Sequence, residues 1–500
     1  KFYVDPRGTP FEFSGAERLV HIATGLSSVL IFPPIAYLSQ ITLGGFAMAL
    51  GKRKRQQQDM FWVAADKLGC GPRNAFYDRL NQLLDEIDFD GKLEKAVEPF
   101  YEKTGRKGLP PGVYFRMIFI GYFEDISSQR GIAWRCDDSR SLARFLGYAP
   151  GESTPDHSTH SMTRERLPME IHRLAFEMIL TADRDLGLLK GKSIGVDATD
   201  LEAISSLKSI VRKDNGDDWR EYLRKLSEDD TGNSDPDDEE LRRFDKGRKP
   251  KKKVSNEDWQ SETDPDSRIG KMKDGRFHLK YKAENAVDLE TEVIVAAEVY
   301  HGNVGDTSTI EDTVNTAQTH LREAGTGCEV KEVVADKGYH GEETLDSLQN
   351  ESLVRTYIPE SDRKTNRTWT DKNARRESSY RRNRRNTLGA RGRQLQRLRS
   401  ERVERSFAHL CDTGGGRRTW LRGLEKVHKR YMTAAMAHNL GRIMRSLIGA
   451  GKPRYAAVLA ERLCFIYFAT QAAVYRLRGF WTTPRSHQEK NRRDLLATCA

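Results

Sequence analysis

Apolar positions between residues 59 and 190 recur every three or four residues, which is the spacing of one face of an α-helix. The pattern is clearest over residues 113–123 and 171–179. Pro110 and Pro111 precede the first of these stretches, where proline is tolerated because the first helical N–H groups need no partner. The pattern predicts an all-α region.

Within this region, a short helix over residues 141–146 is expected to end at Gly147. A loop leads to a second helix that runs through Arg166, with Asp156 or Ser158 as its N-cap. The pair resembles a helix-turn-helix, in which the second helix contacts DNA. Helical pairs are also common as plain packing units, so both interpretations stay open at this point.

The pattern changes at Lys192, where short apolar runs of strand type begin to alternate with helical spacing. Strands are predicted over 193–197, 278–287, 292–300, 330–335 and 354–358, and helices over about 309–323, 342–348, 391–410 and 424–447. The second and third strands form a hairpin, and Asp306 is the expected cap of the helix that follows. This order implies an α/β fold, a mixed sheet flanked by helices with the strand order of ribonuclease H, after an all-α N-terminal domain.

Four segments are predicted. Residues 1–55 form an apolar leader, 56–190 a helical DNA-binding domain, 191–450 the ribonuclease H-like domain, and 451–500 a tail. Residues 200–275 are polar and read as an insertion, partly helical and partly mobile. Residues 19–51 lack charge and precede Lys52–Arg55, as a membrane span would. Prolines, glycines and hydroxyl side chains dilute their hydrophobicity, so the leader is expected to lie outside the working protein.

Composition narrows the class of protein. The 500 residues include 83 Lys and Arg against 73 Asp and Glu, a net charge of +10, and the mean hydropathy is -0.70. These values exclude a polytopic membrane protein and favour a polyanionic partner. The window 372–405 holds 13 basic and 3 acidic residues, so it carries the whole excess. The six cysteines have no Cys-x-x-Cys spacing, which is typical of a reduced, cytosolic protein without a zinc site or a disulfide framework.

Two predicted strands each end in an aspartate, Asp197 and Asp336. Either one alone is more often a turn or cap residue, but two at the ends of neighbouring strands indicate a site. A third acid is expected from the basic helix. Glu404 lies beside its apolar stripe, whereas Glu401 lies further towards solvent. A salt bridge to a nearby arginine is the alternative role for Glu404.

Several motifs resemble those of bacterial insertion-sequence transposases of the DDE type, over about residues 56–450. Gly195–Thr199, Val334–His340 and Val403–Ala408 are similar to the motifs around their three acids. Further similarities lie at Pro155–Thr159, Gly416–Gly423 and Asn439–Leu440. Ser400 and Cys411 depart from the pattern, because related enzymes have arginine and lysine at these two places.

The resemblance implies that Asp197, Asp336 and Glu404 are catalytic and hold Mg²⁺ or Mn²⁺, as two ions. Three converging carboxylates repel each other without cations, and hard oxygen ligands suit these metals. Water would attack first, and the freed 3′-OH would then attack target DNA, without a covalent protein–DNA intermediate. The implied partners are double-stranded DNA, as terminal inverted repeats and target, and a second copy of the chain on DNA. A membrane partner is not expected, and the implied location is the bacterial cytoplasm, at the nucleoid.

The predicted DNA contacts fall into four groups. They are Lys337 and Tyr339 after the second acid; Arg381, Arg382, Arg384 and Arg385 before the catalytic helix; Arg399, Arg402 and Arg405 on it; and Arg417, Arg418 and Arg422 beyond it. Arginine suits bidentate contact with phosphate. Three alternatives remain: a ribonuclease H-like nuclease without strand transfer, a decayed non-catalytic DNA-binding protein, and, most distant, a membrane-tethered protein.

Overall fold

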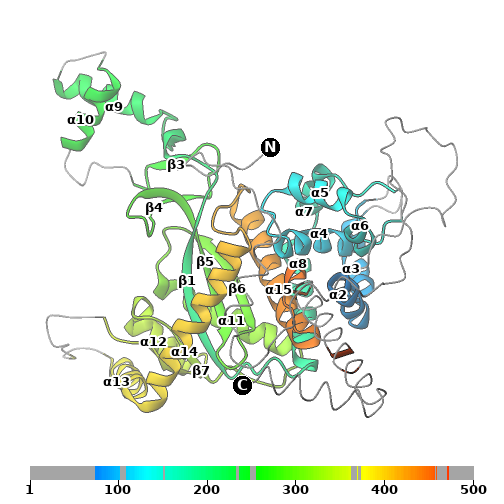
Figure 1. Ribbon diagram of the computed structural model, residues 1–500. Helices are drawn as coiled ribbons and strands as arrows, with labels where there is room; N and C mark the ends of the chain where they lie inside the picture. The colour runs from blue at the N-terminus through cyan, green and yellow to red at the C-terminus, as the bar shows by residue number, and fades with distance from the viewer. Residues whose placement is uncertain are drawn as a thin grey trace, which may run out of the picture. The chain divides into compact units, whose positions relative to one another are not determined.

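The computed structural model describes residues 74–101, 108–149, 152–231, 236–247, 255–361, 369 and 373–456, and a few isolated positions beyond (Figure 1). The chain divides into two compact units, 1–67 and 68–500, and every described residue belongs to the second. The predicted leader therefore lies outside the described residues, as does most of the 451–500 tail. In the part that is described, no helix has both the length and the apolar character needed to cross a bilayer.

The N-terminal part of this unit is helical, as predicted. Its α-helices are α2 (Ala75–Glu86), α3 (Phe89–Val97), α4 (Pro111–Phe123), α5 (Gln129–Asp138), α6 (Arg140–Phe145), α7 (His157–Arg166) and α8 (Met169–Asp185). Helix α4 is buried almost all round, because its apolar residues cover every face. The other helices bury one face against it and against each other.

The predicted two-helix unit around Asp156 is only partly correct. Asp156 is the N-cap of α7, since its side chain accepts a hydrogen bond from the Ser158 N–H at 2.9 Å. However, α6 and α7 each pack chiefly against α5 rather than against each other. The long connection between them separates the two helices, so they do not form the compact pair of a helix-turn-helix.

A six-stranded sheet forms the centre of the rest of the unit. It contains β1 (Ser193–Glu202), β4 (Arg268–Lys271), β5 (Phe277–Asp288), β6 (Ile294–His301), β7 (Glu332–Val334) and β8 (Arg355–Tyr357). Its order is β4-β5-β1-β7-β8, and β6 pairs with β5. Strands β1, β5 and β6 are antiparallel neighbours, whereas β1, β7 and β8 run parallel. This is the mixed ribonuclease H-like sheet that the sequence predicts.

Helices cover both faces of this sheet (Figure 1). Helix α14 (Ala390–Phe407) crosses β1, β5, β7 and β8 on one face. Helix α11 (Asp306–Glu323) packs against β5 and β6 from the other face. Helix α15 (Leu424–Ile448) contacts β6 as well as α4 and α8, so it joins the sheet to the N-terminal helices. Helix α12 (Glu342–Asn350) lies between β7 and β8 in the chain.

Two predictions about the sheet need correction. The first strand does not end at Asp197 but continues to Glu202, because the alternating Asp197–Glu202 segment pairs with β5 throughout. The insertion is also shorter than predicted, since β4 joins the sheet through pairing with β5. Its remaining described elements are η5 (Leu207–Ser209), the β2–β3 pair (Ile210–Arg212 and Trp259–Ser261), α9 (Trp219–Thr231) and α10 (Asp238–Gly247).

Candidate active site

Asp197 of β1 and Asp336, which lies two residues beyond the end of β7, are at the same level on neighbouring parallel segments. The last pair between β1 and β7 joins Gly195 to Val334, and each aspartate follows two residues later. Neighbouring strands are about 4.8 Å apart, so the two carboxyl groups extend from adjacent positions at the end of β7. The structure thus brings together the two acids that the sequence singled out, although Asp197 lies within its strand.

Asp197 is partly buried, and its carboxylate forms an ion pair with an arginine side chain. Arg399 of α14 donates from Nη1 to its Oδ2 at 2.7 Å, and the Ala198 N–H donates to its Oδ1 at 2.8 Å. Burial raises the pKa of Asp197, and the nearby Asp336 carboxylate raises it further, whereas Arg399 and the Ala198 N–H act in the opposite direction. The pKa of Asp197 is raised overall, so Arg399 does not fully compensate for the effects of burial and of the Asp336 carboxylate. The site therefore favours additional positive charge.

Asp336 is held by the loop that follows β7. Its Oδ1 accepts from the Gly338 N–H at 2.8 Å and so caps the 3₁₀ turn η7 (Lys337–Tyr339). Lys337 is exposed beside it, which leaves its predicted phosphate contact sterically open. Tyr339 is fully buried and donates to Glu284 at 2.8 Å, which favours a role in positioning this loop over the predicted contact with DNA.

Behind that loop lies a buried polar network that the sequence did not reveal. Glu284 on β5 accepts hydrogen bonds from Tyr339 and from Thr309 and Thr313 of α11. Lys282 reaches the same carboxylate at 3.3 Å and also pairs with Asp306 at 2.7 Å. The network fixes η7 against α11, and so it fixes the backbone that presents Asp336. Only the placement of Lys282 and Glu284 on one strand, two residues apart, could have suggested it.

Helix α14 is positioned by contacts along its length. Gln396 donates to the carbonyls of Ala335 and Tyr357 at the ends of β7 and β8. Ser406 accepts from the Asn285 amide, and Asn285 is directly opposite Asp197 in the β1–β5 pair. These contacts hold the helix over the two aspartates, although its sequence is mostly polar.

The third predicted acid is on this helix but is not drawn into the pair. Glu404 is exposed on the flank of α14, one residue beyond the buried Val403. Glu401 is also exposed and pairs with Arg405 at 2.6 Å. Among the described residues, no three His, Cys, Asp or Glu side chains come close enough to form a metal-binding group. The two aspartates alone provide adjacent hard oxygen donors of the kind that Mg²⁺ and Mn²⁺ prefer.

Gly195 allows α14 to approach β1 closely. A Cβ atom at this position would lie 2.7 Å from Leu289 and 2.8 Å from Val403. Both distances are shorter than a normal van der Waals contact, so a larger residue would have to displace the Leu289 and Val403 side chains. Gly195 thus leaves room for α14, which carries Arg399 and Glu404, to lie close to the strand of Asp197.

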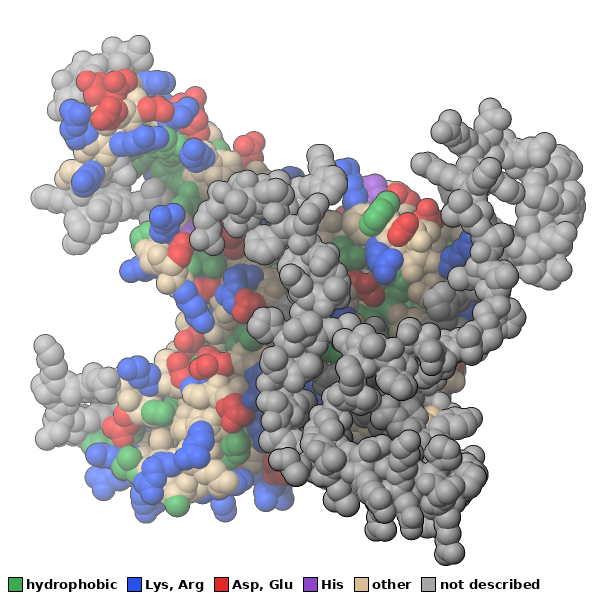
Figure 2. Space-filling view, in the orientation of Figure 1, with side chains coloured by type: hydrophobic (Ala, Val, Ile, Leu, Met, Phe, Trp, Pro, Cys, Tyr) green, Lys and Arg blue, Asp and Glu red, His purple; other side chains and the backbone are tan. Residues whose placement is uncertain are grey.

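The arginines predicted to contact DNA differ in their surroundings. Arg381, Arg382, Arg384 and Arg385 lie on α13 (Ala374–Leu388), a helix that the sequence pattern did not predict, and all four are exposed. Figure 2 shows Lys and Arg side chains gathered over this part of the surface. Arg399, Arg402 and Arg405 instead contact Asp197, the Leu289 carbonyl and Glu292. Arg417, Arg418 and Arg422 are exposed, with Arg417 paired to Asp412 and Arg418 over the Trp420 ring.

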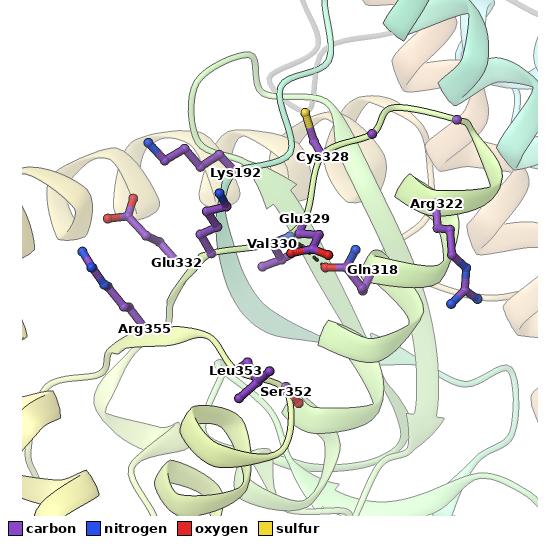
Figure 3. Close-up of a pocket in the computed structure, with 13 residues that line it drawn as sticks. Lys192, Gln318, Arg322, Cys328, Glu329, Val330, Glu332, Ser352, Leu353 and Arg355 are labelled. Carbon is purple, nitrogen blue, oxygen red and sulfur yellow. Dashed lines mark hydrogen bonds between the residues drawn. The ribbon is translucent and has the colours of Figure 1, made fainter.

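A large hollow in the described part of the molecule lies away from the aspartates. It has a volume of about 1060 Å³ and is lined by Lys192, Val330 and Arg355, among others, before or at the starts of β1, β7 and β8 (Figure 3). The aspartates lie towards the opposite ends of the same parallel strands. Sites in sheets with parallel strands form at the carboxyl ends, so the hollow is a separate feature.

Two family models match the chain. The transposase domain DUF772 matches residues 69–166, which include α2 to α7, and the transposase DDE domain matches residues 248–440, which include Asp336 and Glu404. Asp197 precedes the second match, so its assignment rests on its position beside Asp336. No curated protein and no solved structure matches the chain.

Proposed function

Because this chain belongs to the insertion-sequence DDE transposases, which are polynucleotidyl transferases acting on DNA, we propose that it binds the ends of its own element and performs metal-dependent strand cleavage and strand transfer. The observation that carries the proposal is the level placement of Asp197 and Asp336 on adjacent parallel segments. We further propose that Glu404 supplies the third carboxylate, and that two copies of the chain act together on DNA.

The donor set supports a divalent cation. DDE transposases as a family use such ions, and the raised pKa of Asp197 indicates a need for positive charge at this point. Asp197 and Asp336 would hold Mg²⁺ or Mn²⁺, with Glu404 of α14 as the further ligand. When bound, the metal would stabilise charge on the scissile phosphate and activate the attacking oxygen.

Side chains around Asp197 and Asp336 would bind the phosphates of the DNA and hold the site in place. Arg399 neutralises Asp197 and would be free to contact a phosphate oxygen when that carboxylate has another partner. Lys337, exposed beside Asp336, would bind the adjoining phosphate. The exposed arginines of α13 would bind the DNA backbone without reading its sequence. The buried Glu284 network would keep Asp336 in place during the reaction.

The test is a cleavage and joining assay with the full-length chain. A labelled duplex carrying one terminal repeat and its flanking DNA is incubated with Mg²⁺ or Mn²⁺ and a supercoiled target plasmid. The proposal predicts a nick with a 3′-OH at the element boundary, followed by labelled plasmid. Cleavage without joining would favour a nuclease, and repeat-specific binding without cleavage would favour a decayed DNA-binding protein.

A further inference from the structure

A pocket rich in basic residues lies between α14 and α15. It is lined by Arg402 and Arg405 of α14, Arg442 and Arg445 of α15, and Lys452 and Arg454 beyond, and we call these six residues the arginine pocket. Arg402 donates to the Leu289 carbonyl, and the Leu289 N–H bonds to Ser193. Ser193 is four residues before Asp197, or ~13 Å of strand. The cations of the pocket are therefore not those that contact Asp197, although Ser406 in its lining bonds to Asn285, the strand partner of Asp197.

Positive charge exceeds negative charge in this pocket. Glu292 accepts from Arg405 at 2.7 Å and from Arg442 at 2.8 Å, Asp125 pairs with Lys452 and Arg454, and Glu401 pairs with Arg405. Six cations thus face three carboxylates, which leaves three positive charges in excess. A further carboxyl near Arg442, Asp183, is fully buried, and burial raises its pKa well above the usual value, which favours its neutral form.

Two histidines that line the pocket do not add to its positive charge. Burial lowers the pKa of both His409 and His438, and Arg445 lowers both further. Each histidine is therefore neutral near pH 7 and adds no positive charge of its own. The imidazoles form part of the wall, where Tyr122 lies 3.4 Å from His438 Nδ1.

Two guanidinium nitrogens around the pocket make no hydrogen bond within the described part of the chain, although one of them, Arg402 Nε, lies 3.9 Å from Glu292 Oε1. The Nε atoms of Arg402 and Arg442 are buried without a hydrogen bond in the described structure. Arg445 is exposed at the rim. Glu292 and Asp125, the two acids that hold the cations, both adopt left-handed backbone conformations, with φ of 64° and 57°. Such strained conformations persist where surrounding contacts enforce them, and they gather at functional sites.

The size of the pocket limits the ligand. Its volume is about 80 Å³, far below the roughly 300–1,000 Å³ of sites for drug-sized molecules. It has room for one small anion but not for a nucleobase. Guanidinium groups bind phosphate through paired N–H donors, so the exposed guanidinium groups of Arg445 and Arg454 suit phosphate oxygens. We propose that the arginine pocket binds one phosphate group of DNA in addition to the phosphate held at the carboxylates, an inference that rests on the DNA binding proposed above.

The experiment compares two pairs of substitutions in the full-length chain. Arg445→Gln with Arg454→Gln removes two exposed cations of the pocket, while Arg322→Gln with Arg355→Gln removes two exposed cations at the separate hollow of Figure 3. Binding of a labelled duplex is measured by fluorescence anisotropy across a KCl series. We expect the first pair to flatten the slope of log K against log salt by about 0.9, the value for one phosphate that is no longer neutralised, and the control pair to leave it unchanged.

The Glu292→Gln variant tests the phosphate site by removing a negative charge from the pocket instead of positive ones. Removing the central carboxylate should strengthen DNA binding, whereas a purely structural role for Glu292 would weaken or not change it. Inorganic phosphate, titrated against chloride at equal ionic strength, should raise the melting temperature of the wild type more than that of the first pair. This readout does not involve DNA.

The outcomes separate the two proposals. An unchanged salt slope in the Arg445 and Arg454 variant would overturn the DNA-phosphate site, and a phosphate effect that persists alone would assign the pocket to a free anion instead. A wild-type chain that binds no DNA would contradict the proposed function itself. The inference stands only if slope, Glu292 effect and phosphate effect all follow the expected directions.

Discussion

Two consecutive helices, α13 and α14, share one arginine-rich stretch of sequence but use it differently. On α13 the arginines are exposed, and their partners are surface acids, as in the Arg381–Glu377 pair. On α14, Arg399 and Arg391 instead reach the sheet, where they hold Asp197 and Glu332, while Arg393 and Arg397 remain exposed. The comparison shows that the role of an arginine depends on what its helix packs against. Helix α13 offers charge to a partner, whereas α14 organises the site.

The largest loss of strand cleavage should follow from substitution of the three predicted catalytic acids, two of which lie under α14 and one on it. Asp197→Asn, Asp336→Asn or Glu404→Gln should each reduce strand cleavage by ~10³-fold or more, since the acids act as a unit. Double variants should be little worse than single ones, and DNA binding should persist. Cleavage at defined element ends, with Glu401→Gln as the matched control, measures this. Near-normal cleavage by the Glu404 variant would remove α14 from catalysis.

Withdrawal of metal should have a similarly large effect on cleavage but little on binding. EDTA should abolish cleavage, and Mg²⁺ or Mn²⁺ should restore it. Ca²⁺ should support DNA binding without efficient cleavage, because it accepts looser coordination than the octahedral ions. Parallel binding and cleavage assays in each ion distinguish the two steps. Full cleavage in EDTA would contradict the role assigned to the aspartates.

A smaller, graded effect is expected from α13. Changing Arg381, Arg382, Arg384 and Arg385 to Ala should weaken binding to all DNA sequences about equally, and should flatten the salt slope by roughly 0.9 for each phosphate that these arginines neutralise. Cleavage at saturating DNA should change little, which would separate α13 from α14. Anisotropy across a salt series with specific and unrelated duplexes measures both quantities. Loss of sequence preference in the variant would argue against backbone contact.

The smallest effect concerns the stability of the Arg399 contact. Arg399→Gln leaves the partly buried Asp197 without its cation, which should lower the free energy of unfolding by about 1–3 kcal/mol. Mn²⁺ should restore more stability to this variant than to the wild type, since the metal would take over the same carboxylate. Urea unfolding with and without Mn²⁺ tests this, with Arg393→Gln, an exposed α14 residue, as control. Equal metal effects in both proteins would contradict the assignment.

Much of the sheet could be predicted from sequence because its strands bury apolar residues in period with their geometry. The β5–β6 hairpin, β7 and β8 follow directly from such runs. Helix α13 could not be found in this way, since Tyr380 is its only buried apolar side chain and its stability comes from contacts such as Asn383 with the Ile358 backbone. Strand β4 was missed for the same reason, as its polar sequence pairs only because β5 offers an edge.

In the candidate site, too, some residues could be predicted from the sequence and others could not. Asp197 and Asp336 were recognisable because each follows an apolar run in the sequence, and Asp156 because capping is a local property. The partner of Asp197 was not recognisable, since the pairing with Arg399 depends on how α14 crosses the sheet, 202 residues later in the chain. The arginine pocket was hidden for a related reason: its cations come from three segments, and only folding brings them around Glu292.

The close approach at Gly195 has a consequence for how a copy of such an element could lose its activity. A single added methyl group there would meet Leu289 and Val403 before any charged residue had changed. The resulting protein would retain every acid and every arginine, and a comparison of sequences by their catalytic residues would score it as intact. The spacing between a helix and a strand at this position would thus matter to the site as its charged residues do, and damage to it would change none of the residues that carry charge.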